Sequence, residues 1–303
     1  MASHNGVNRL FGGTGGVVDG HVHLWDTAAM RISWFRDDLG LPPRVGPGDL
    51  ARAVATSPVP VRAAVAVQAA DTEGESRWLL RQSAAHVPLP GPVVLQYDAR
   101  PTEPDAWAGM AQAVIDDGAT APGVAGVRLA VPGGAADLSD VAGLDALCEG
   151  LAATGRVLET LVRPEQLAAV AALAARHPTL DVVVCHLGLG TGEPDASWRD
   201  ALAAVAARRR AHAKLSGLFT TSRDDAGRVA AAARAAVDLL GPERLLFGSD
   251  WPMSARVAPY AEIVGRTAAA LPPLDDGAAA AVWSGTAERL YGAATRTSPA
   301  PRG

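Results

Sequence analysis

The chain has 303 residues, of which 49% are hydrophobic and 19% charged, and its net charge is -5. This composition is typical of a globular enzyme with a large apolar core, and the length suits one barrel of alternating strands and helices as well as two average domains. The net negative charge provides no electrostatic footprint for nucleic acid or for an anionic membrane surface, so we expect neither as a partner. No apolar run predicts a membrane-spanning helix.

The cysteine content and the two ends of the chain bear on its setting and its domain limits. Two cysteines, Cys148 and Cys185, are too few for a disulfide framework and favour a reducing, cytoplasmic setting. Residues 1–16 lack the basic and apolar regions of a signal peptide, and we interpret them as a flexible leader. The polar residues 293–303 are interpreted as a flexible tail. Residues 17–292 show no break in composition and are predicted to form a single domain.

Short runs rich in valine, leucine and isoleucine alternate with alanine-rich amphipathic stretches throughout this domain. The alternation is expected when parallel strands are buried on both faces and helices connect them. Eight runs predict a TIM (β/α)8 barrel of the α/β class, slightly distorted. The runs are Val17–His23, Pro60–Gln68, Pro92–Tyr97, Val124–Val131, Arg156–Val162, Asp181–Leu187, His212–Leu218 and Arg244–Asp250. Helices are expected over Pro104–Asp117, Asp137–Ala153, Asp224–Leu240 and Pro259–Leu271.

The first run ends in two histidines, His21 and His23, which are separated by one residue. Side chains two apart on a strand point the same way, so both imidazoles are predicted to face one ion or oxyanion. A purely structural pair of histidines is the alternative. The connection that follows, residues 24–48, is unusually long and carries Trp25 and Trp34, which is typical of a lid or binding loop.

Two further polar residues close apolar runs later in the chain. His186 ends the sixth run and Asp250 ends the last one, where the catalytic face of a barrel is expected. A satisfied core histidine and a helix-capping aspartate are the structural alternatives. Cys185, beside His186, is expected to point to the opposite face and pack as a small hydrophobic residue.

These run ends together resemble a known family. The pair His21 and His23, the stretch His186-Leu187-Gly188 and the stretch Gly248-Ser249-Asp250-Trp251-Pro252 resemble the amidohydrolase superfamily, and most closely its amidohydrolase-related branch. That branch includes lactonases that act on sugar lactones and on pyrone dicarboxylate. Its typical stretches have counterparts in Gly126-Val127-Arg128 and in residues 214–218, and the resemblance extends from about Val17 to Tyr291.

The resemblance implies roles for the four residues at the run ends. His21, His23 and His186 would line a mononuclear metal or carbonyl-polarising site, with Asp250 as a further ligand and as the base that activates water. The implied cofactor is one divalent ion, zinc in the first place and manganese in the second. Some lactonases of the branch are thought to work without an ion, so the resemblance leaves its necessity open. The fourth run offers no lysine that could be carbamylated to bridge two metals, which disfavours a binuclear site.

Other residues are weaker candidates. Glu159, a charged residue inside an apolar run, is predicted to supplement the metal ligands or bind a substrate hydroxyl, with a structural ion pair as the alternative. Arg128 and Lys214 are candidates for substrate binding, again with an intrabarrel ion pair as the alternative. The remaining substrate-binding candidates are Gln68, which offers hydrogen bonds, and Trp25, Trp34 and Trp251, which offer flat apolar walls or simple packing.

The predicted function is hydrolysis of a sugar-acid or pyrone-type lactone, a small-molecule substrate, by water that Asp250 activates. A decarboxylase or hydratase on the same barrel is the enzymatic alternative. It is disfavoured because the seventh run offers Lys214 and Ser216 where a decarboxylase would be expected to place a histidine. A non-catalytic ligand-binding barrel is the third reading, because fold does not determine function. A homodimer is compatible with the sequence.

Overall fold

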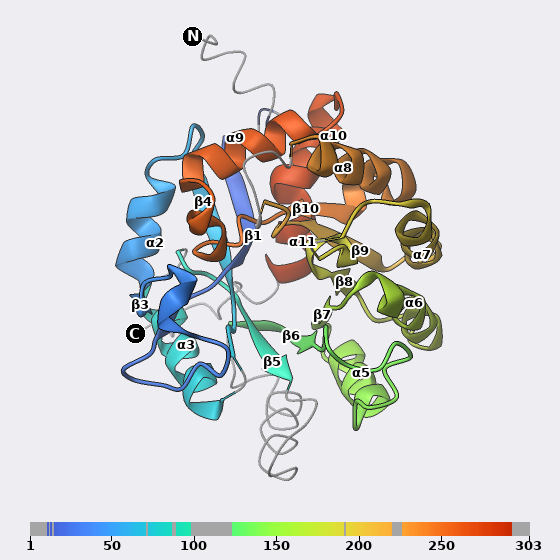
Figure 1. Cartoon of the computed structure of the whole chain (residues 1–303), viewed down its shortest axis with the longest axis horizontal. Coiled ribbons are helices and arrows are strands. Elements are labelled where there is room, and N and C mark those ends of the chain that lie inside the picture. Colours follow the sequence, from blue (N-terminus) through green and yellow to red (C-terminus); the bar gives the residue numbers. More distant parts are fainter. Residues whose placement is uncertain are drawn as a thin grey trace, which may run out of the picture.

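The computed structural model describes residues 11, 13, 15–70, 72–86, 89–97, 123–190, 192–219 and 226–292. In this part of the chain, eight parallel strands form one sheet in the order β1-β4-β5-β6-β7-β8-β9-β10. They are β1 Val17–Val22, β4 Val61–Val67, β5 Val93–Tyr97, β6 Val124–Ala130, β7 Val157–Leu161, β8 Val182–Val184, β9 Ala211–Leu215 and β10 Leu245–Phe247. A parallel bridge between Val22 and Trp251 closes the sheet into a ring (Figure 1). The predicted (β/α)8 barrel is therefore confirmed.

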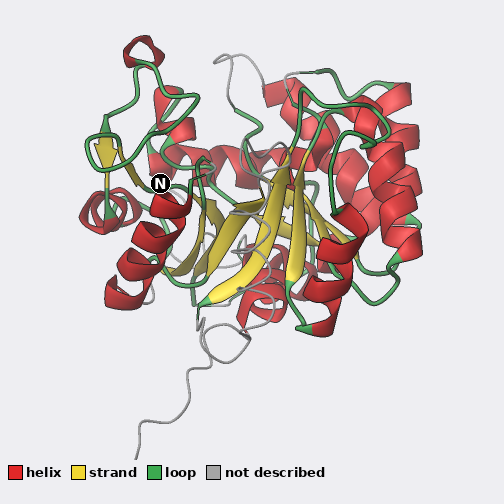
Figure 2. Ribbon diagram, turned by 90° about the horizontal axis from the view of Figure 1, so that it is seen from below, coloured by secondary structure: helices red, strands yellow, loops and turns green. Residues whose placement is uncertain are grey.

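Helices surround the ring of strands in Figure 1, and Figure 2 shows the strands enclosed between them. The described helices are α2 Pro47–Val54, α3 Glu73–His86, α5 Leu144–Ala153, α6 Leu167–Arg176, α7 Ala196–Ala206, α8 Ala226–Leu240, α9 Tyr260–Ala270, α10 Asp276–Ala280 and α11 Thr286–Tyr291. A small antiparallel pair, β2 Trp25–Asp26 and β3 Arg44–Val45, folds the long connection after β1 back on itself. No helix among the described residues combines the length and the apolar character needed to cross a lipid bilayer.

The strands are buried on both faces, which explains their continuous apolar character. Outside the ring, strand residues pack against the surrounding helices in two large clusters. Inside it, one apolar layer takes residues from seven strands and from α11; its members include Val18, Val65, Val94, Ala125, Val157, Val183, Leu246 and Tyr291. Because α11 contacts β1, β6 and β10, it plugs the barrel interior at this layer.

The ends of the predicted elements differ from the structure in an informative way. Strands β8, β9 and β10 stop several residues before the predicted runs do, because the backbone turns into the left-handed region at His186, Leu187, Gly217 and Asp250. The helix expected over Asp137–Ala153 begins only at Leu144, after Gly143 with a φ of 67°. The helix expected over Pro104–Asp117 and the tail 293–303 lie outside the described residues, as does most of the expected leader. Phe11, which was expected in that leader, is buried with its ring 4.6 Å from that of Trp283.

Candidate active site

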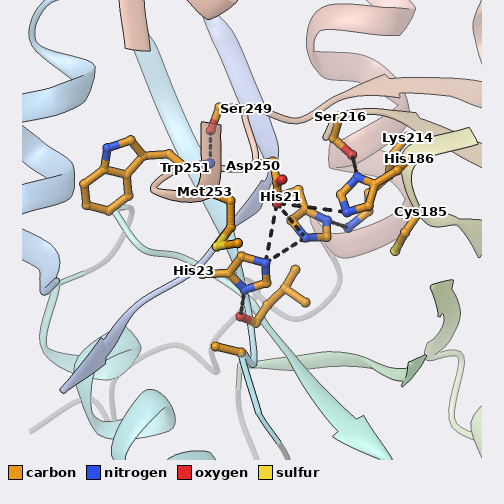
Figure 3. Close-up of polar contacts among 12 residues, drawn as sticks. His21, His23, Cys185, His186, Lys214, Ser216, Ser249, Asp250, Trp251 and Met253 are labelled. Carbon is orange, nitrogen blue, oxygen red and sulfur yellow. Dashed lines mark hydrogen bonds and ion pairs between the residues drawn. The ribbon is translucent and has the colours of Figure 1, made fainter. Parts of the chain in front are cut away.

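Four polar side chains meet where β1, β8 and β10 end (Figure 3). The Oδ1 atom of Asp250 lies 3.6 Å from Nε2 of His21, 3.6 Å from Nε2 of His23 and 4.0 Å from Nε2 of His186. These distances exceed a direct hydrogen bond. Asp250 therefore faces all three imidazoles while none of them bonds to that oxygen. The structure brings together the four residues that the sequence predicted from the run ends.

The backbone at this site adopts conformations that L-residues rarely occupy. His186 has a φ of 54° and Asp250 a φ of 58°. Each such residue costs on the order of 1–3 kcal/mol and persists only where its surroundings enforce it. Two glycines make the close approach possible. A Cβ on Gly217 would lie 2.5 Å from Nδ1 of His186, and one on Gly248 would lie 2.7 Å from Cβ of His21.

Asp19 is a supporting residue that the sequence analysis did not single out. Its carboxylate accepts hydrogen bonds from the backbone N–H of His21 at 3.0 Å and of Ser249 at 2.9 Å, and from the hydroxyl of Tyr260 at 2.9 Å. The residue is fully buried, and burial raises the pKa of its carboxyl above the ordinary value. Asp19 ties the end of β1 to the turn that carries Asp250. The signal in the sequence is its position two residues before His21 on the same strand.

Hydrogen bonds determine which ring nitrogens of the first two histidines carry protons. Nδ1 of His23 lies 2.7 Å from the carbonyl oxygen of Val67, which can only accept, so this nitrogen holds a proton. In neutral His23 the Nε2 lone pair then faces the site. For His21 the order is reversed, because Nζ of Lys214 lies 3.2 Å from its Nδ1. An ammonium group only donates, so neutral His21 carries its proton on Nε2, the nitrogen 3.2 Å from Nε2 of His23.

Burial and neighbouring charge shape the ionisation of the site. Burial lowers the pKa of His21 well below 6.5, and the charge of Lys214 lowers it further, so His21 is neutral near pH 7. Burial also lowers the pKa of His186. For Asp250, burial acts to raise the pKa, but the facing His186, His23 and Arg128 outweigh it and hold the pKa below its ordinary value. The site thus presents a carboxylate beside a neutral N–H donor.

Glu159 and Lys214 form a buried ion pair in the barrel interior, with Oε1 of Glu159 2.6 Å from Nζ. Lys214 also donates to the carbonyl of Gly20 at 2.7 Å, and the hydroxyl of Tyr291 donates to Glu159 at 2.7 Å. Both charged side chains are fully buried. The structural alternative is therefore the arrangement present. Lys214 is closed off from substrate. The carboxylate of Glu159 is engaged by Lys214 and Tyr291, but it also lies within 4.8 Å of ligand atoms of His21 and Cys185, a set that could hold a metal ion, so its place as a metal ligand stays a prediction.

Cys185 corrects a further expectation. Its thiol does not pack on the outer face but donates to Oε2 of Glu159 at 3.4 Å inside the barrel. Strand alternation itself places Cys185 inside, because Val183 lies in the inner layer while Val182 and Val184 pack outside. The residue that departs from alternation is His186, where the backbone turns left-handed with a φ of 54°.

Three of the expected substrate contacts have structural roles instead. The side chain of Gln68 is fully buried, accepts from the N–H of Gln96 and the hydroxyl of Ser76, and donates to Thr72. Trp25 is fully buried, and its indole N–H donates to Pro42 at 2.9 Å. The indole of Trp251 is buried and points away from the three imidazoles (Figure 3).

Arg128 and Trp34 remain the candidates for substrate contact. Arg128 is 3% exposed, and its guanidinium charge acts on His21, His186 and Asp250. Its Nη2 donates to Gln68 and Gln96, whereas its buried Nε has no hydrogen-bond partner among the described residues. Trp34 is half-buried in the connection after β1, and its indole N–H donates to the carbonyl of Ala69 at 2.7 Å.

The donor set fits one divalent ion. Ligand atoms of His21, His186 and Asp250 lie within 4.8 Å of one another, and Nε2 of His23 borders the same space. Imidazole nitrogens and a carboxylate oxygen are ligands that zinc prefers. His21 could join the set through Nε2 in its other tautomer, with the proton moved to Nδ1, which requires Lys214 to give up its contact with that nitrogen. Ser216, whose hydroxyl lies 2.8 Å from Nδ1 of His186, orients that ring from the far side.

A comparison with protein families identifies the family of the chain. The family model described as Amidohydrolase matches residues 18–293, from β1 to just past α11. The chain belongs to the amidohydrolase family. The family that the run ends resemble is thereby confirmed.

Individual relatives narrow the comparison further. The chain is 33% identical over 244 residues to an L-fucono-1,5-lactonase of Burkholderia ambifaria, and the matched region covers 78% of this chain and 80% of the relative. It is 29% identical over 312 residues to an L-fucono-1,5-lactonase of Burkholderia multivorans, covering 90% and 95%. The crystal structure of an amidohydrolase from Burkholderia multivorans with bound zinc is also similar. It has a TM-score of 0.77 and 29% identity, covering 91% of this chain and 99% of that one.

Proposed function

We propose that the chain is a lactonase that opens the ring ester of a sugar lactone with water. The convergence of Asp250 Oδ1 with three imidazole nitrogens at 3.6–4.0 Å is the observation that carries this proposal. Both curated relatives described above are L-fucono-1,5-lactonases, which favours a sugar lactone over a pyrone lactone.

The geometry supports a sequence of two proton transfers by one carboxylate. Asp250 takes a proton from water as the water oxygen adds to the lactone carbonyl carbon. The N–H that Lys214 maintains on Nε2 of His21 donates to Nε2 of His23 at 3.2 Å, and it is shared with the carbonyl oxygen as negative charge develops there. When the bond between the carbonyl carbon and the ring oxygen breaks, Asp250 returns its proton to the departing oxygen. The product is an open-chain hydroxy acid.

We further propose that one divalent ion, zinc before manganese, binds among His21, His23, His186 and Asp250 and assists the reaction without being required. The donor set described above supports binding, and the similar structure from Burkholderia multivorans holds zinc. A bound ion supplies Lewis-acid polarisation of the carbonyl. The N–H of His21 can donate to the same oxygen without an ion, which is why we expect activity to survive chelation.

Arg128 is proposed to contact the substrate through Nε, its buried N–H without a partner among the described residues. A hydroxyl of a sugar lactone would satisfy that donor, and an unsatisfied buried donor costs on the order of 1–3 kcal/mol. Trp34, whose indole is half-buried, is proposed to offer an apolar wall on the side of the connection after β1.

The decisive experiment is a panel of lactones assayed by acid release. The panel includes L-fucono-1,5-lactone, D-glucono-1,5-lactone and a pyrone dicarboxylate, and we expect the sugar lactones to be turned over. Asp250→Asn should lower kcat/KM by ~10²–10⁴-fold. Asp195→Asn, which alters a carboxylate that caps α7, serves as the control. Release of carbon dioxide, or full activity of Asp250→Asn, would refute the proposed chemistry.

Metal dependence is tested separately by elemental analysis before and after chelation. We expect close to one zinc ion per chain after growth with zinc, and a loss of activity of no more than about tenfold in the stripped protein, because the His21 donor remains. Activity that returns only when a metal is added would contradict the proposed auxiliary role.

The setting of the protein is proposed on the state of its two thiols. Cys148 and Cys185 are free and buried, and burial raises the pKa of Cys148 to about 12, so neither is a reactive thiolate. This supports a reducing, cytoplasmic location, which cell fractionation can check. A single folded domain over residues 17–292, without nucleic-acid or membrane partners, is proposed on composition and charge. Sedimentation analysis decides between a monomer and the homodimer that the sequence leaves open.

A further inference from the structure

Residues 67–70, which begin at the last residue of β4, bind three side chains from three other parts of the chain. The carbonyl of Val67 accepts from Nδ1 of His23 at 2.7 Å. The next carbonyl accepts from Arg128 at 2.5 Å, and the third accepts from the indole of Trp34 at 2.7 Å. One short stretch of backbone therefore positions a histidine of the site and both candidates for substrate contact.

Glu75 holds the same segment from the opposite side. One carboxylate oxygen accepts from the N–H of Ala69 at 2.7 Å and of Ala70 at 3.1 Å, and the other accepts from Ala70 at 2.9 Å. Gln68 adds a longer contact at 3.4 Å. Glu75 lies near the start of α3 and is fully buried. Burial disfavours the charged carboxylate and raises the pKa of Glu75 to about 7. The hydrogen bonds from Ala69, Ala70 and Gln68 act in the opposite direction and stabilise the carboxylate in this buried place.

The planarity of the peptide bond connects Glu75 to two of the three side chains and not to the third. The N–H of Ala69 and the carbonyl that Arg128 bonds belong to one peptide unit, and the N–H of Ala70 and the carbonyl that Trp34 bonds belong to the next. Because each unit is rigid, fixing its N–H also fixes its carbonyl. The unit that holds His23 is fixed by a different contact, the N–H of residue 68 donating to Val94 at 2.8 Å.

We propose that Glu75 is a positioning residue that sets the placement of Arg128 and Trp34 through these two rigid peptide units. The inference rests on the proposed function, in which both side chains contact the lactone. Glu75 touches neither the substrate nor the reacting atoms. Its loss therefore weakens substrate binding and leaves the proton transfers of Asp250 intact.

The test uses Glu75→Gln, which keeps the shape but places an NH2 group against a backbone N–H. We expect KM to rise about tenfold and kcat to stay within about twofold, because a charged hydrogen-bond acceptor is lost only on the binding side. Glu75→Asp is a second variant, which keeps the charge but is one methylene too short to reach both N–H groups. Leu79→Val, which loosens the packing of the same helix without touching the carboxylate, is the matched control and should leave KM unchanged.

A spectroscopic measurement tests the positioning role of Glu75 independently of turnover. In the two-dimensional ¹H–¹⁵N spectrum, the indole N–H signal of Trp34, assigned by its absence in Trp34→Phe, should shift in Glu75→Gln. The imidazole N–H signal of His23 should stay in place, because β5 holds its acceptor. If no lactone in the panel is hydrolysed, the proposed function fails, but this spectrum still shows whether Glu75 positions Trp34. An unmoved Trp34 signal, an unchanged KM, or an equal effect of Leu79→Val would overturn the proposal.

Discussion

Histidine and aspartate lie close together at both ends of this barrel, but only at one end are they directly hydrogen-bonded. At the carboxyl end, Asp250 faces three imidazoles at 3.6–4.0 Å. At the amino end, Asp181 precedes β8, accepts from Nε2 of His212 at 3.0 Å and bonds Arg210 with its other oxygen. The second carboxylate has its partners in place, whereas the first has an oxygen that no imidazole bonds directly.

The difference teaches that residue type alone does not identify a catalytic pair. A carboxylate whose oxygens are both engaged holds two strands together, and one whose oxygen is left over can accept a proton from water. The backbone reinforces the contrast. Asp250 and His186 sit in left-handed conformations, while His212 lies within the regular strand β9. Strain of this kind is characteristic of functional sites.

Within this comparison, the largest expected difference lies between removing a histidine at the catalytic end and removing one at the amino end. His186→Asn should lower kcat/KM by ~10²–10³-fold, because an imidazole that faces the proposed base Asp250 is lost. His212→Asn should leave kcat/KM within about threefold of the parent. Steady-state kinetics on the best lactone measures both. Equal losses at the two ends would break the comparison.

The buried ion pair between the two ends should matter for stability, besides the contact by which Lys214 sets the tautomer of His21. Lys214→Met leaves the buried Glu159 carboxylate without its cation and should lower the free energy of unfolding by about 3–5 kcal/mol. The double variant Lys214→Met/Glu159→Leu should recover much of that loss, because it removes the uncompensated charge as well. Urea denaturation measures the free energy of unfolding of the parent protein, the single variant and the double variant. A double variant no more stable than the single one would contradict the account.

Gly217 sharpens the comparison at the catalytic end. Gly217→Ala strains a backbone with a φ of 60° and brings a Cβ to 2.5 Å from His186 Nδ1, so kcat/KM should fall about 10- to 100-fold. Gly155→Ala is the control, since Gly155 has a φ of 66° and open space around it. It should lose stability to a similar extent and keep its activity. Activity loss in both variants would point to strain alone.

The smallest effect concerns the amino end and acid. Burial acts to raise the pKa of Asp181, but His212 and Arg210 outweigh it and hold the pKa below 3.8. The unfolded chain thus binds more protons below that value, so the stabilisation is complete above about pH 4 and is lost as pH falls through the folded pKa. With partial exposure it should amount to no more than about 1 kcal/mol. Asp181→Asn should flatten this part of the stability profile in urea titrations between pH 2 and 5.

Several features of the site could be predicted because they are local. His21 and His23 share a face through strand alternation, and His186 and Asp250 end apolar runs, where a barrel places its functional side chains. The eight strands were evident for the same reason. Their ends were overestimated by a few residues where the backbone turns left-handed, which side-chain polarity alone does not announce.

Partners distant in the chain could not be predicted. Lys214 was a candidate for substrate binding until the closed barrel placed it against Gly20, Glu159 and His21. Gln68 and Trp25 have buried hydrogen-bond partners, and the thiol of Cys185 lies inside the barrel beside Glu159. Glu75 carries no recognisable motif at all, and its importance follows only from the peptide units that it holds.

The sequence by itself determined which residue types close each strand and therefore which side chains reach the catalytic rim. Only the tertiary structure decided which of the polar side chains remain free to act, because a buried group is satisfied or left over according to neighbours that closure of the barrel supplies. Asp250 keeps an oxygen that no imidazole bonds, whereas Asp181 does not, although both lie beside a histidine at a strand end.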